Sequence, residues 1–202
     1  MKIRYAVPWR PSEPRERLWA FCRSWWSECL PEARFTMGLH TDGPFNRSAA
    51  INRAAYGTWD ILAIFDADVF ASGVQVRQAI ARVEQTGCIG YAFDRYVGLH
   101  PKTTEALLAG EAPDLEGQAR FRSAEHCSSI VIVRRDLWER IGPFDEAYTG
   151  WGLEDVAFAH KAGPEVRAAG AVYHLWHPPS PHKHRGKLYR ENRQRFAAQV
   201  NG

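Results

Sequence analysis

Short apolar runs alternate along the chain with amphipathic stretches, a pattern that predicts strands and helices in turn. The most distinct run is Ile61–Phe65, which is wholly apolar and is bounded by Asp60 before it and by Asp66 and Asp68 after it. A run this short, rich in branched and aromatic side chains, is typical of a strand buried on both faces of a sheet. We therefore expect this strand at the centre of the sheet.

The same criteria predict the remaining elements. Apolar residues three and four apart indicate helices, and short apolar runs ended by turn residues indicate strands. The expected strands are residues 3–8, 35–40, 61–65, 88–93, 128–133 and 171–175. The expected helices are residues 13–29, 45–56, 74–84, 136–141, 153–161 and 188–200. This order predicts an α/β domain whose mostly parallel central sheet is covered by helices on both faces.

Residues 94–125 follow no sustained period, and we expect an insertion or a mobile loop there. The length of 202 residues fits a single domain with a sizeable core. We divide the domain into a nucleotide-binding half (1–93), an acceptor and catalytic half (94–179) and a basic C-terminal tail with a helix (180–202).

Composition narrows the class of protein. The apolar fraction is 45% and the charged fraction 24%, which is ordinary for a soluble globular chain. No apolar run reaches membrane-spanning length, and the first residues resemble a strand more than a signal peptide. The four cysteines are scattered without a Cys-x-x-Cys pair, so we expect them reduced in a cytoplasmic protein.

Positive charge is concentrated near the C-terminus. Residues 182–195 hold six Lys or Arg and one Glu, a net +5, so the rest of the chain carries 3 − 5 = −2. Such a tail could hold a diphosphate or contact a polyanionic acceptor. It could equally be a solvated helix face.

Asp66 and Asp68 follow the central strand, one residue apart. The carboxyl ends of strands are where open α/β sheets bind ligands. Two neighbouring acids repel each other unless a cation lies between them or between one of them and a ligand. Carboxylate oxygens suit Mg²⁺ or Mn²⁺, so the pair predicts a metal and diphosphate site. The alternative is a strand-ending turn with two solvated acids.

Two further segments could bind a nucleotide. The helix expected over residues 45–56 offers its N-terminus and Arg47 to a phosphate. The turn Pro8–Arg10, together with Asp42, follows the first two strands and could hold a base and a ribose. An ordinary amphipathic helix and a surface loop are the alternatives.

Two segments near the end of the chain could complete the site. In Gly150–Asp155, two glycines flank Trp151 and two acids open a helix, which suits a lid with a general base. Acids are also favoured in any first helical turn, so capping is the alternative. His174 lies at the end of the last expected strand and is a candidate metal ligand, although a lone histidine is commonly without metal.

Taken together, these residues resemble the GT-A nucleotide-sugar glycosyltransferases, above all the family-two-type enzymes and the carboxyl-terminal domain shared by galactosyltransferases and polypeptide N-acetylgalactosaminyltransferases. The resemblance implies that Asp66-Ala67-Asp68 is the metal motif, with Asp68 as direct ligand and His174 as a further one. It implies that the helix from Asn46 to Arg53 lies beside the donor. It also implies that Glu154 and Asp155 contact the acceptor, with one acid as the base in inverting members.

The chain departs from the family at two points. Ser128-Ser129 stands where a Gly-Gly is common, which alters the sugar pocket, and Val156–His160 replaces an acid-x-Arg continuation. The lack of a stem, a lectin domain and disulfides makes the chain more similar to bacterial or phage enzymes than to Golgi ones.

We therefore predict a metal-dependent glycosyltransferase that uses a nucleoside diphosphate sugar, in particular a UDP-sugar, with Mn²⁺ or Mg²⁺. The acceptor is a hydroxyl of a glycan, a protein or a modified DNA base. Asp155 is the candidate base and Glu154 orients the acceptor. The metal ligands are Asp68, His174 and Asp66, and the donor is held by Pro8, Trp9, Arg10, Asp42, Arg47, Asn52, Asp66, Ala67, Trp151 and Gly152.

Three alternatives remain from the residues alone. A nucleotidyltransferase also uses paired acids and a metal but releases pyrophosphate. A nucleic-acid-binding module would use the basic tail without turnover. A structural zinc protein using His174, His177, His182 and His184 is disfavoured because no cysteine spacing supports it.

Overall fold

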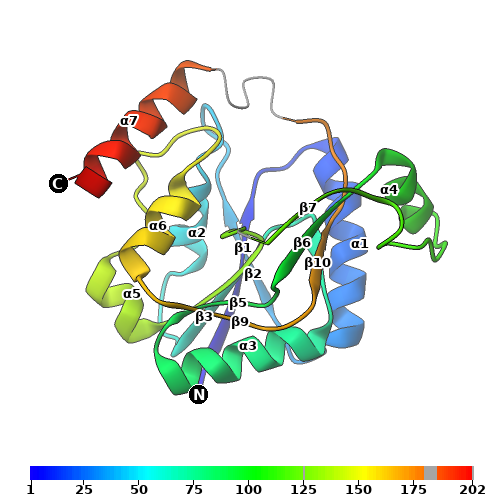
Figure 1. Cartoon of the computed structure of the whole chain (residues 1–202), viewed down its shortest axis with the longest axis horizontal. Coiled ribbons are helices and arrows are strands. Elements are labelled where there is room, and N and C mark those ends of the chain that lie inside the picture. Colours follow the sequence, from blue (N-terminus) through cyan, green and yellow to red (C-terminus); the bar gives the residue numbers. More distant parts are fainter. Residues whose placement is uncertain (125, 180–185, 202) are drawn as a thin grey trace.

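The computed structural model describes residues 1–124, 126–179 and 186–201. Within these residues the strands form two sheets, one of six strands and one of four (Figure 1). The larger sheet contains β1 (Ile3–Trp9), β2 (Phe35–Leu39), β3 (Ile61–Phe65), β5 (Ile89–Tyr91), β8 (Ile130–Arg134) and β9 (Glu165–Arg167). The smaller contains β4 (Val69–Phe70), β6 (Arg95–Leu99), β7 (Ala119–Ser123) and β10 (Ala171–His174).

The larger sheet has the strand order β2-β1-β3-β8-β5-β9. Its pairings are parallel except at β8, which runs antiparallel to both β3 and β5. All five residues of β3 are buried, as a wholly apolar strand inside a covered sheet requires. The expected central strand is therefore confirmed, with the boundaries given by its apolar run.

Helices cover both faces of this sheet. The helices among the described residues are α1 (Glu13–Cys29), α2 (Arg47–Ala54), α3 (Gly73–Thr86), α4 (Pro101–Leu108), α5 (Arg135–Ile141), α6 (Glu154–Ala162) and α7 (Lys187–Asn201), of which α4 packs on α1 and α7 on α6. Trp19 of α1 packs its ring on Phe35, whereas a Cβ added at Gly38 would clash with the backbone of Ala50 in α2. Since Phe35 and Gly38 point to opposite faces of β2, α1 and α2 lie on opposite sides of the sheet. The predicted α/β fold class is confirmed.

The expectation that residues 94–125 form an irregular stretch is wrong. These residues contain β6, α4 and β7, and β6 and β7 pair antiparallel at one side of the smaller sheet. β7 reads Ala-Arg-Phe-Arg-Ser and is an edge strand of partly or fully exposed residues, so it has no apolar run to reveal it. The short strands β4 and β9 were missed for a related reason, because two or three residues carry no readable period.

The smaller sheet places β10 beside the residues that follow the central strand β3. β10 pairs antiparallel with β4, and His174 lies opposite Val69 in that register. Val69 directly follows Asp68, so the pairing places His174 beside the second acid of the Asp66–Asp68 pair. Residues about 100 positions apart in sequence are thus brought together by the pairing of β10 with the two residues of β4.

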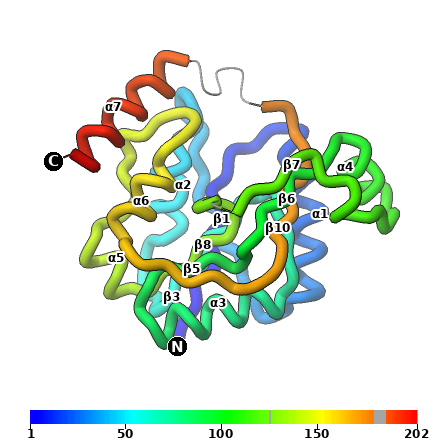
Figure 2. The backbone as a smooth tube through the Cα atoms, viewed as in Figure 1, coloured from blue at the N-terminus to red at the C-terminus, as the bar shows by residue number. Residues whose placement is uncertain are grey.

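The two ends of the chain serve different parts of the fold. β1 lies between β2 and β3 inside the larger sheet, whereas α7 lies at the periphery beside α6 (Figure 2). No helix among the described residues is both long and apolar enough to cross a membrane. All four cysteines are free thiols, as expected.

Candidate active site

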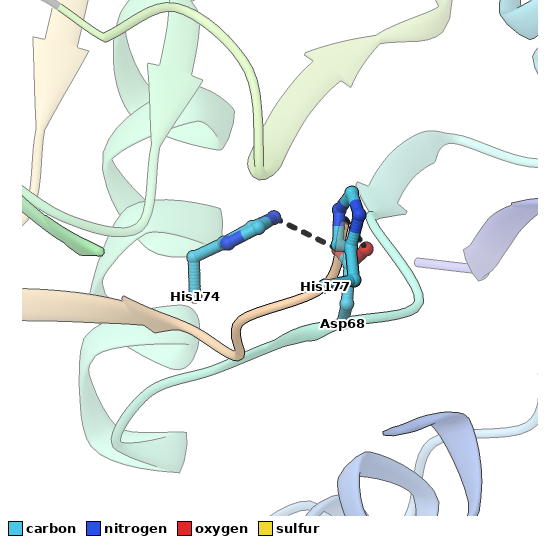
Figure 3. A group of neighbouring side chains, drawn as sticks. All are labelled: Asp68, His174 and His177. Atoms are coloured by element: carbon cyan, nitrogen blue, oxygen red, sulfur yellow. Dashed lines mark ion pairs between the residues drawn. The ribbon is translucent and has the colours of Figure 1, made fainter. Parts of the chain in front are cut away.

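Asp68, His174 and His177 form a group that could hold a metal ion. Asp68 Oδ1 lies 3.6 Å from His174 Nε2, and Asp68 Oδ2 lies 3.3 Å from His177 Nε2. One ligand atom from each residue lies within 4.8 Å of the others. Figure 3 shows both imidazole rings beside the carboxylate, one from the end of β10 and one from the segment after it. Three donors around one point leave room for further ligands from a substrate.

The chemistry of these donors suits a first-row divalent ion. One buried carboxylate and two imidazoles present one oxygen and two nitrogen atoms, and imidazole is a poorer ligand for Mg²⁺ than for transition metals. Burial lowers the pKa of His174, against the opposing charge of Asp68, so its ring stays neutral and keeps a lone pair for a metal. Of the two predicted ions, the residues fit Mn²⁺ better than Mg²⁺.

The role of His177 was left open by the sequence, and the structure assigns it to this group. His174 and His177 are three residues apart, and their ring centroids lie 5.2 Å apart. A second histidine three residues after His174, which ends the last strand, is the sequence signal that could have identified His177. Arg15 also approaches, with Nη1 3.7 Å from Asp68 Oδ2, and brings a positive charge to the edge of the group.

Asp66 lies outside the metal-capable group. Arg47 Nε and Nη2 both donate to Asp66 Oδ1, and the hydroxyl of Ser128 and the N–H of Ser129 donate to Oδ2. Burial alone would raise the pKa of Asp66, but the charge of Arg47 and these hydrogen bonds outweigh it and lower the pKa. Both oxygens of Asp66 are thus already bound by the protein, and its predicted metal contact stays a prediction.

Arg47 connects the metal motif to the acids of α6. Its Nη1 lies 3.6 Å from Glu154 Oε1 and finds no hydrogen-bond acceptor among the described residues. Burial and the neighbouring charge of Asp155 raise the pKa of Glu154 to about 7, against the opposing charge of Arg47. Asp155 Oδ1 accepts a hydrogen bond from the N–H of Val156. Two motifs far apart in sequence therefore meet at Arg47.

The loop before α6 has an unusual backbone. Gly152 has a φ of 106° and Leu153, which caps the helix, has a φ of 76°. Leu153 lies in the left-handed region that branched or bulky L-residues avoid, and no side chain caps α6. The ring of Trp151 lies 5.4 Å from that of Tyr189 in α7. The predicted loop with its two glycines is thus present, leads into the acids that open α6, and packs against the C-terminal helix.

The residues predicted for the nucleotide base and ribose lie at the ends of β1 and β2. Trp9 ends β1, and its neighbour Arg10 donates to the carbonyls of Gly43 at 2.5 Å and Thr41 at 3.3 Å. Arg10 therefore binds the turn that carries the exposed Asp42. Pro8 lies within β1 and is buried, and so is Ala67, between the two acids.

Asn52 has a structural partner in place of an open site. Its amide donates to the carbonyl of Phe144 and to Glu146 Oε1, and its oxygen accepts from the N–H of Phe144. Asn46 caps α2, accepting from the N–H of Ala49. These contacts fasten α2 to the segment that leads into the acid-bearing loop, and donor contact by Asn52 stays a prediction.

His126 is a residue that the sequence reasoning missed. Its ring lies 4.0 Å from the ring of Tyr96, which in turn lies 5.8 Å from His174. Burial lowers the pKa of His126, while the charges of Asp155 and Asp66 oppose that shift. The ring thus lies in the field of both groups of acids. Its segment gave no signal because a single histidine in an irregular stretch has no pattern.

Comparison with known proteins identifies the fold. Residues 116–165 match the model of a family described as the N-terminal domain of galactosyltransferase. No curated protein matches the chain. A Drosophila β1,4-galactosyltransferase 7 mutant, crystallised with manganese, UDP-Gal and xylobiose, superposes with a TM-score of 0.55 at 20% identity. That match covers 83% of this chain and 64% of the enzyme's, so the chain spans less than two thirds of that relative.

Two other solved structures agree. Glucosyl-3-phosphoglycerate synthase from Mycobacterium tuberculosis, in complex with Mn²⁺, UDP and glucosyl-3-phosphoglycerate, has a TM-score of 0.51 at 16% identity, over 99% of this chain and 80% of that one. GalNAc-T7 with UDP, GalNAc and Mn²⁺ has a TM-score of 0.54 at 12% identity, over 96% and 42%. The fold of this chain is the GT-A fold, as the resemblance implied.

Proposed function

We infer that this chain is a metal-dependent glycosyltransferase that moves a sugar from a nucleoside diphosphate sugar, in particular a UDP-sugar, to an acceptor hydroxyl. One observation carries the inference. Asp68 of the metal-capable group is two residues from Asp66, which pairs with the buried Arg47 at 2.8 Å, and Arg47 in turn lies 3.6 Å from Glu154. A metal-capable group beside a carboxyl with a pKa of about 7 supplies what a metal-assisted transfer needs.

Asp68, His174 and His177 would hold the metal, with Mn²⁺ preferred to Mg²⁺. When bound, the ion offsets the negative charge that develops on a leaving diphosphate. The solved relatives support a divalent ion at such a site, because their complexes contain Mn²⁺ with UDP or UDP-Gal and, for the M. tuberculosis synthase, also Mg²⁺ with UDP. The preference for Mn²⁺ rests on the two imidazoles of this chain. Arg15, close to Asp68 Oδ2, adds a second positive charge on the side where a diphosphate would lie.

Arg47 would organise the reacting groups. Its charge is matched by Asp66 and Glu154, so it acts less as a free phosphate-binding cation than as a fixed link between the motifs. Its Nη1 is buried without a hydrogen-bond acceptor among the described residues, and it can donate to a bound sugar or phosphate oxygen.

Asp155 remains the proposed base, with Glu154 orienting the acceptor. In the transfer, the acceptor oxygen forms a bond to the anomeric carbon, the bond from that carbon to the diphosphate oxygen breaks, and the acceptor proton passes to a carboxylate. Glu154 is the rival candidate, because a carboxyl that titrates near neutral pH is matched to proton transfer there. Glu154 contacts the buried Arg47 directly, and the charge of Asp155 also acts on that cation.

The two halves of the chain would divide the work. Residues 1–93 would hold the donor, with Trp9, Arg10 and Asp42 at the base and ribose. Trp151 and Gly152, from the second half, would contact the donor sugar. Residues 94–179 would hold the acceptor, which is a glycan, a protein or a modified DNA base. Of the basic tail, His182, Lys183, His184 and Arg185 lie outside the described residues, and the helix α7 follows them. The free thiols favour a reducing compartment such as the cytoplasm.

A donor screen tests this function. The purified chain is incubated with a panel of UDP-, GDP- and TDP-sugars, with Mn²⁺, with Mg²⁺ and with a chelator, and release of nucleoside diphosphate is measured. The matched control is Asp68→Asn, which keeps the size of the side chain and removes its charge. Metal-dependent release that this variant lacks supports the inference. Release of pyrophosphate would favour a nucleotidyltransferase, and salt-sensitive DNA binding without turnover would favour a nucleic-acid-binding module.

A further inference from the structure

The helix α7 packs against the loop 149–153, which precedes the acids of α6, through apolar side chains and one buried amide. Among its described residues only Asn192 is buried, with 3% of its surface exposed. A buried amide is costly unless its N–H groups are satisfied, and this one satisfies both on a single loop. Asn192 Nδ2 donates to the carbonyl of Thr149 at 3.1 Å and to that of Gly152 at 3.0 Å. The two carbonyls bracket Gly150 and Trp151.

The loop is built to receive the helix. A Cβ added at Gly150 would lie 3.0 Å from Leu188, and one added at Gly152 would lie 3.2 Å from the ring of Tyr189. Both glycines also have positive φ values, 74° and 106°. Any other residue at these positions would strain the backbone, and its Cβ would crowd the side chain of Leu188 or Tyr189 in α7. The close approach of α7 and the conformation of the loop are therefore required together.

The conformation so fixed determines where Glu154 points. Leu153, which follows the bracketed segment, is held at a φ of 76°, a state that persists only where its surroundings enforce it. The next residue is Glu154, whose carboxylate lies 3.6 Å from Arg47 Nη1. On the other side of the loop, the N–H of Gly150 donates to the carbonyl of Phe45, just before α2. Asn192 and Phe45 thus hold the loop from opposite sides.

We propose that Asn192 is a positioning residue, through which α7 fixes the loop 149–153 and so aims the Glu154 and Asp155 carboxyl groups at the reacting atoms. The proposal rests on the proposed glycosyltransferase function for its catalytic consequence. The geometry of the clamp does not depend on which sugar or acceptor is used. The proposal gives α7 a positioning role, which is separate from any contact that the basic tail makes with a polyanion.

The test compares Asn192→Ala with Gln199→Ala. Gln199 is a matched control, because it is also a carboxamide of α7 and donates one hydrogen bond, to the carbonyl of Ala157 in the body of α6. A misplaced catalytic group can cost about 100-fold, so Asn192→Ala should lower kcat by about 10- to 100-fold. It should leave the affinity for Mn²⁺ with UDP unchanged and shift the limb of the pH–rate profile near neutrality. Gln199→Ala should change neither kcat nor the profile.

Hydrogen exchange separates this proposal from the proposed function. Backbone amides of residues 150–156 should exchange faster in Asn192→Ala than in the wild type and in Gln199→Ala, whether or not a donor has been found. If the wild type turns over no nucleotide sugar, the proposed function fails while exchange still tests the clamp. If Asn192→Ala folds poorly, Asn192→Ser, which keeps one donor, should give a smaller shift in the same direction. Equal kcat, pH profile and exchange in the Asn192 and Gln199 variants would overturn the proposal.

Discussion

Arg47 donates two hydrogen bonds to a single oxygen of Asp66, at 3.0 Å from Nε and 2.8 Å from Nη2. This pairing gives the two acids of the Asp66–Asp68 pair different environments. Asp66 is neutralised by a hydrogen-bonded cation that the protein itself provides, whereas Asp68 faces two imidazoles and has only the more distant Arg15, at 3.7 Å. The repulsion between neighbouring carboxylates is thus relieved for one acid inside the fold, which leaves the other for an external cation.

The first prediction concerns the stability of this arrangement. Arg47→Met should lower the free energy of unfolding by about 3–5 kcal/mol at pH 7, because it leaves the carboxylate of Asp66 buried without its cation and raises the pKa of Glu154 further. The loss should shrink as the pH is lowered and the two acids become protonated. Urea denaturation followed by circular dichroism measures both effects. The control is Arg53→Met on the same helix, which loses one exposed hydrogen bond and should cost at most about 1.5 kcal/mol. Equal losses would mean that Arg47 does not carry the pair.

The second prediction concerns Asp68. Asp68→Ala should weaken the binding of Mn²⁺ together with UDP by at least about 100-fold, since it removes the carboxylate of the group, and even outer-shell changes cost 10- to 100-fold. Titration calorimetry measures the affinity, and thermal melting shows whether the fold persists. Glu84→Ala, an exposed acid of α3, should leave the affinity unchanged. Wild-type affinity in Asp68→Ala would place the metal elsewhere.

The third prediction concerns His177. His177→Ala should weaken Mn²⁺ binding by about 10- to 100-fold, because one of two imidazole ligands is lost. Mg²⁺ should support less activity than Mn²⁺ in the wild type, and the difference should narrow in the variant, whose remaining set has fewer nitrogen donors. His100→Ala is the control, since His100 is exposed and its side chain caps nothing. If the two histidine variants bind Mn²⁺ equally well, His177 is not a ligand.

The fold followed from the sequence wherever periodicity was strong. The buried run Ile61–Phe65 gave the central strand and its bounds, and the turn signals around it gave the helices of the first half. The smaller sheet was not predictable in this way, because β7 is polar and β4 has two residues. Such strands are fixed by pairing partners far away in sequence, which local patterns do not record.

The site followed a similar division. Its acids and His174 could be found because each stands at the end of a recognisable element. The link from Arg47 to Glu154 could not, since it joins a helix start to a helix start across the fold. The part played by Asn192 was hidden for another reason. From the sequence, a polar residue on a basic helix is expected to face solvent. The structure shows instead that Asn192 is buried and donates to two carbonyls.

The last prediction decides between the two acids of α6 and begins with their titration. Burial, and then the charge of Asp155, raise the pKa of Glu154 from its ordinary value of 4.5 to about 7. Between these pH values the folded state binds more protons than the unfolded state, so the contribution of Glu154 to stability falls as the pH rises through that range. Glu154→Gln cannot titrate. Its stability should therefore fall less than that of the wild type from pH 5 to pH 8, as measured by melting temperature.

Activity then separates the two roles. If Asp155 is the base, Asp155→Asn should lower kcat by ~10²–10⁴-fold, or about 2.7–5.4 kcal/mol of barrier, with donor affinity kept. Glu154→Gln should then retain most of kcat but bind acceptor less well. If Glu154 is the base, the losses are exchanged. Asp155→Asn would then remove a neighbouring negative charge, lower the pKa of Glu154 and move the limb of the pH–rate profile to lower pH. Near-wild-type kcat in both variants, with an inverted product by NMR, would exclude either acid as the base.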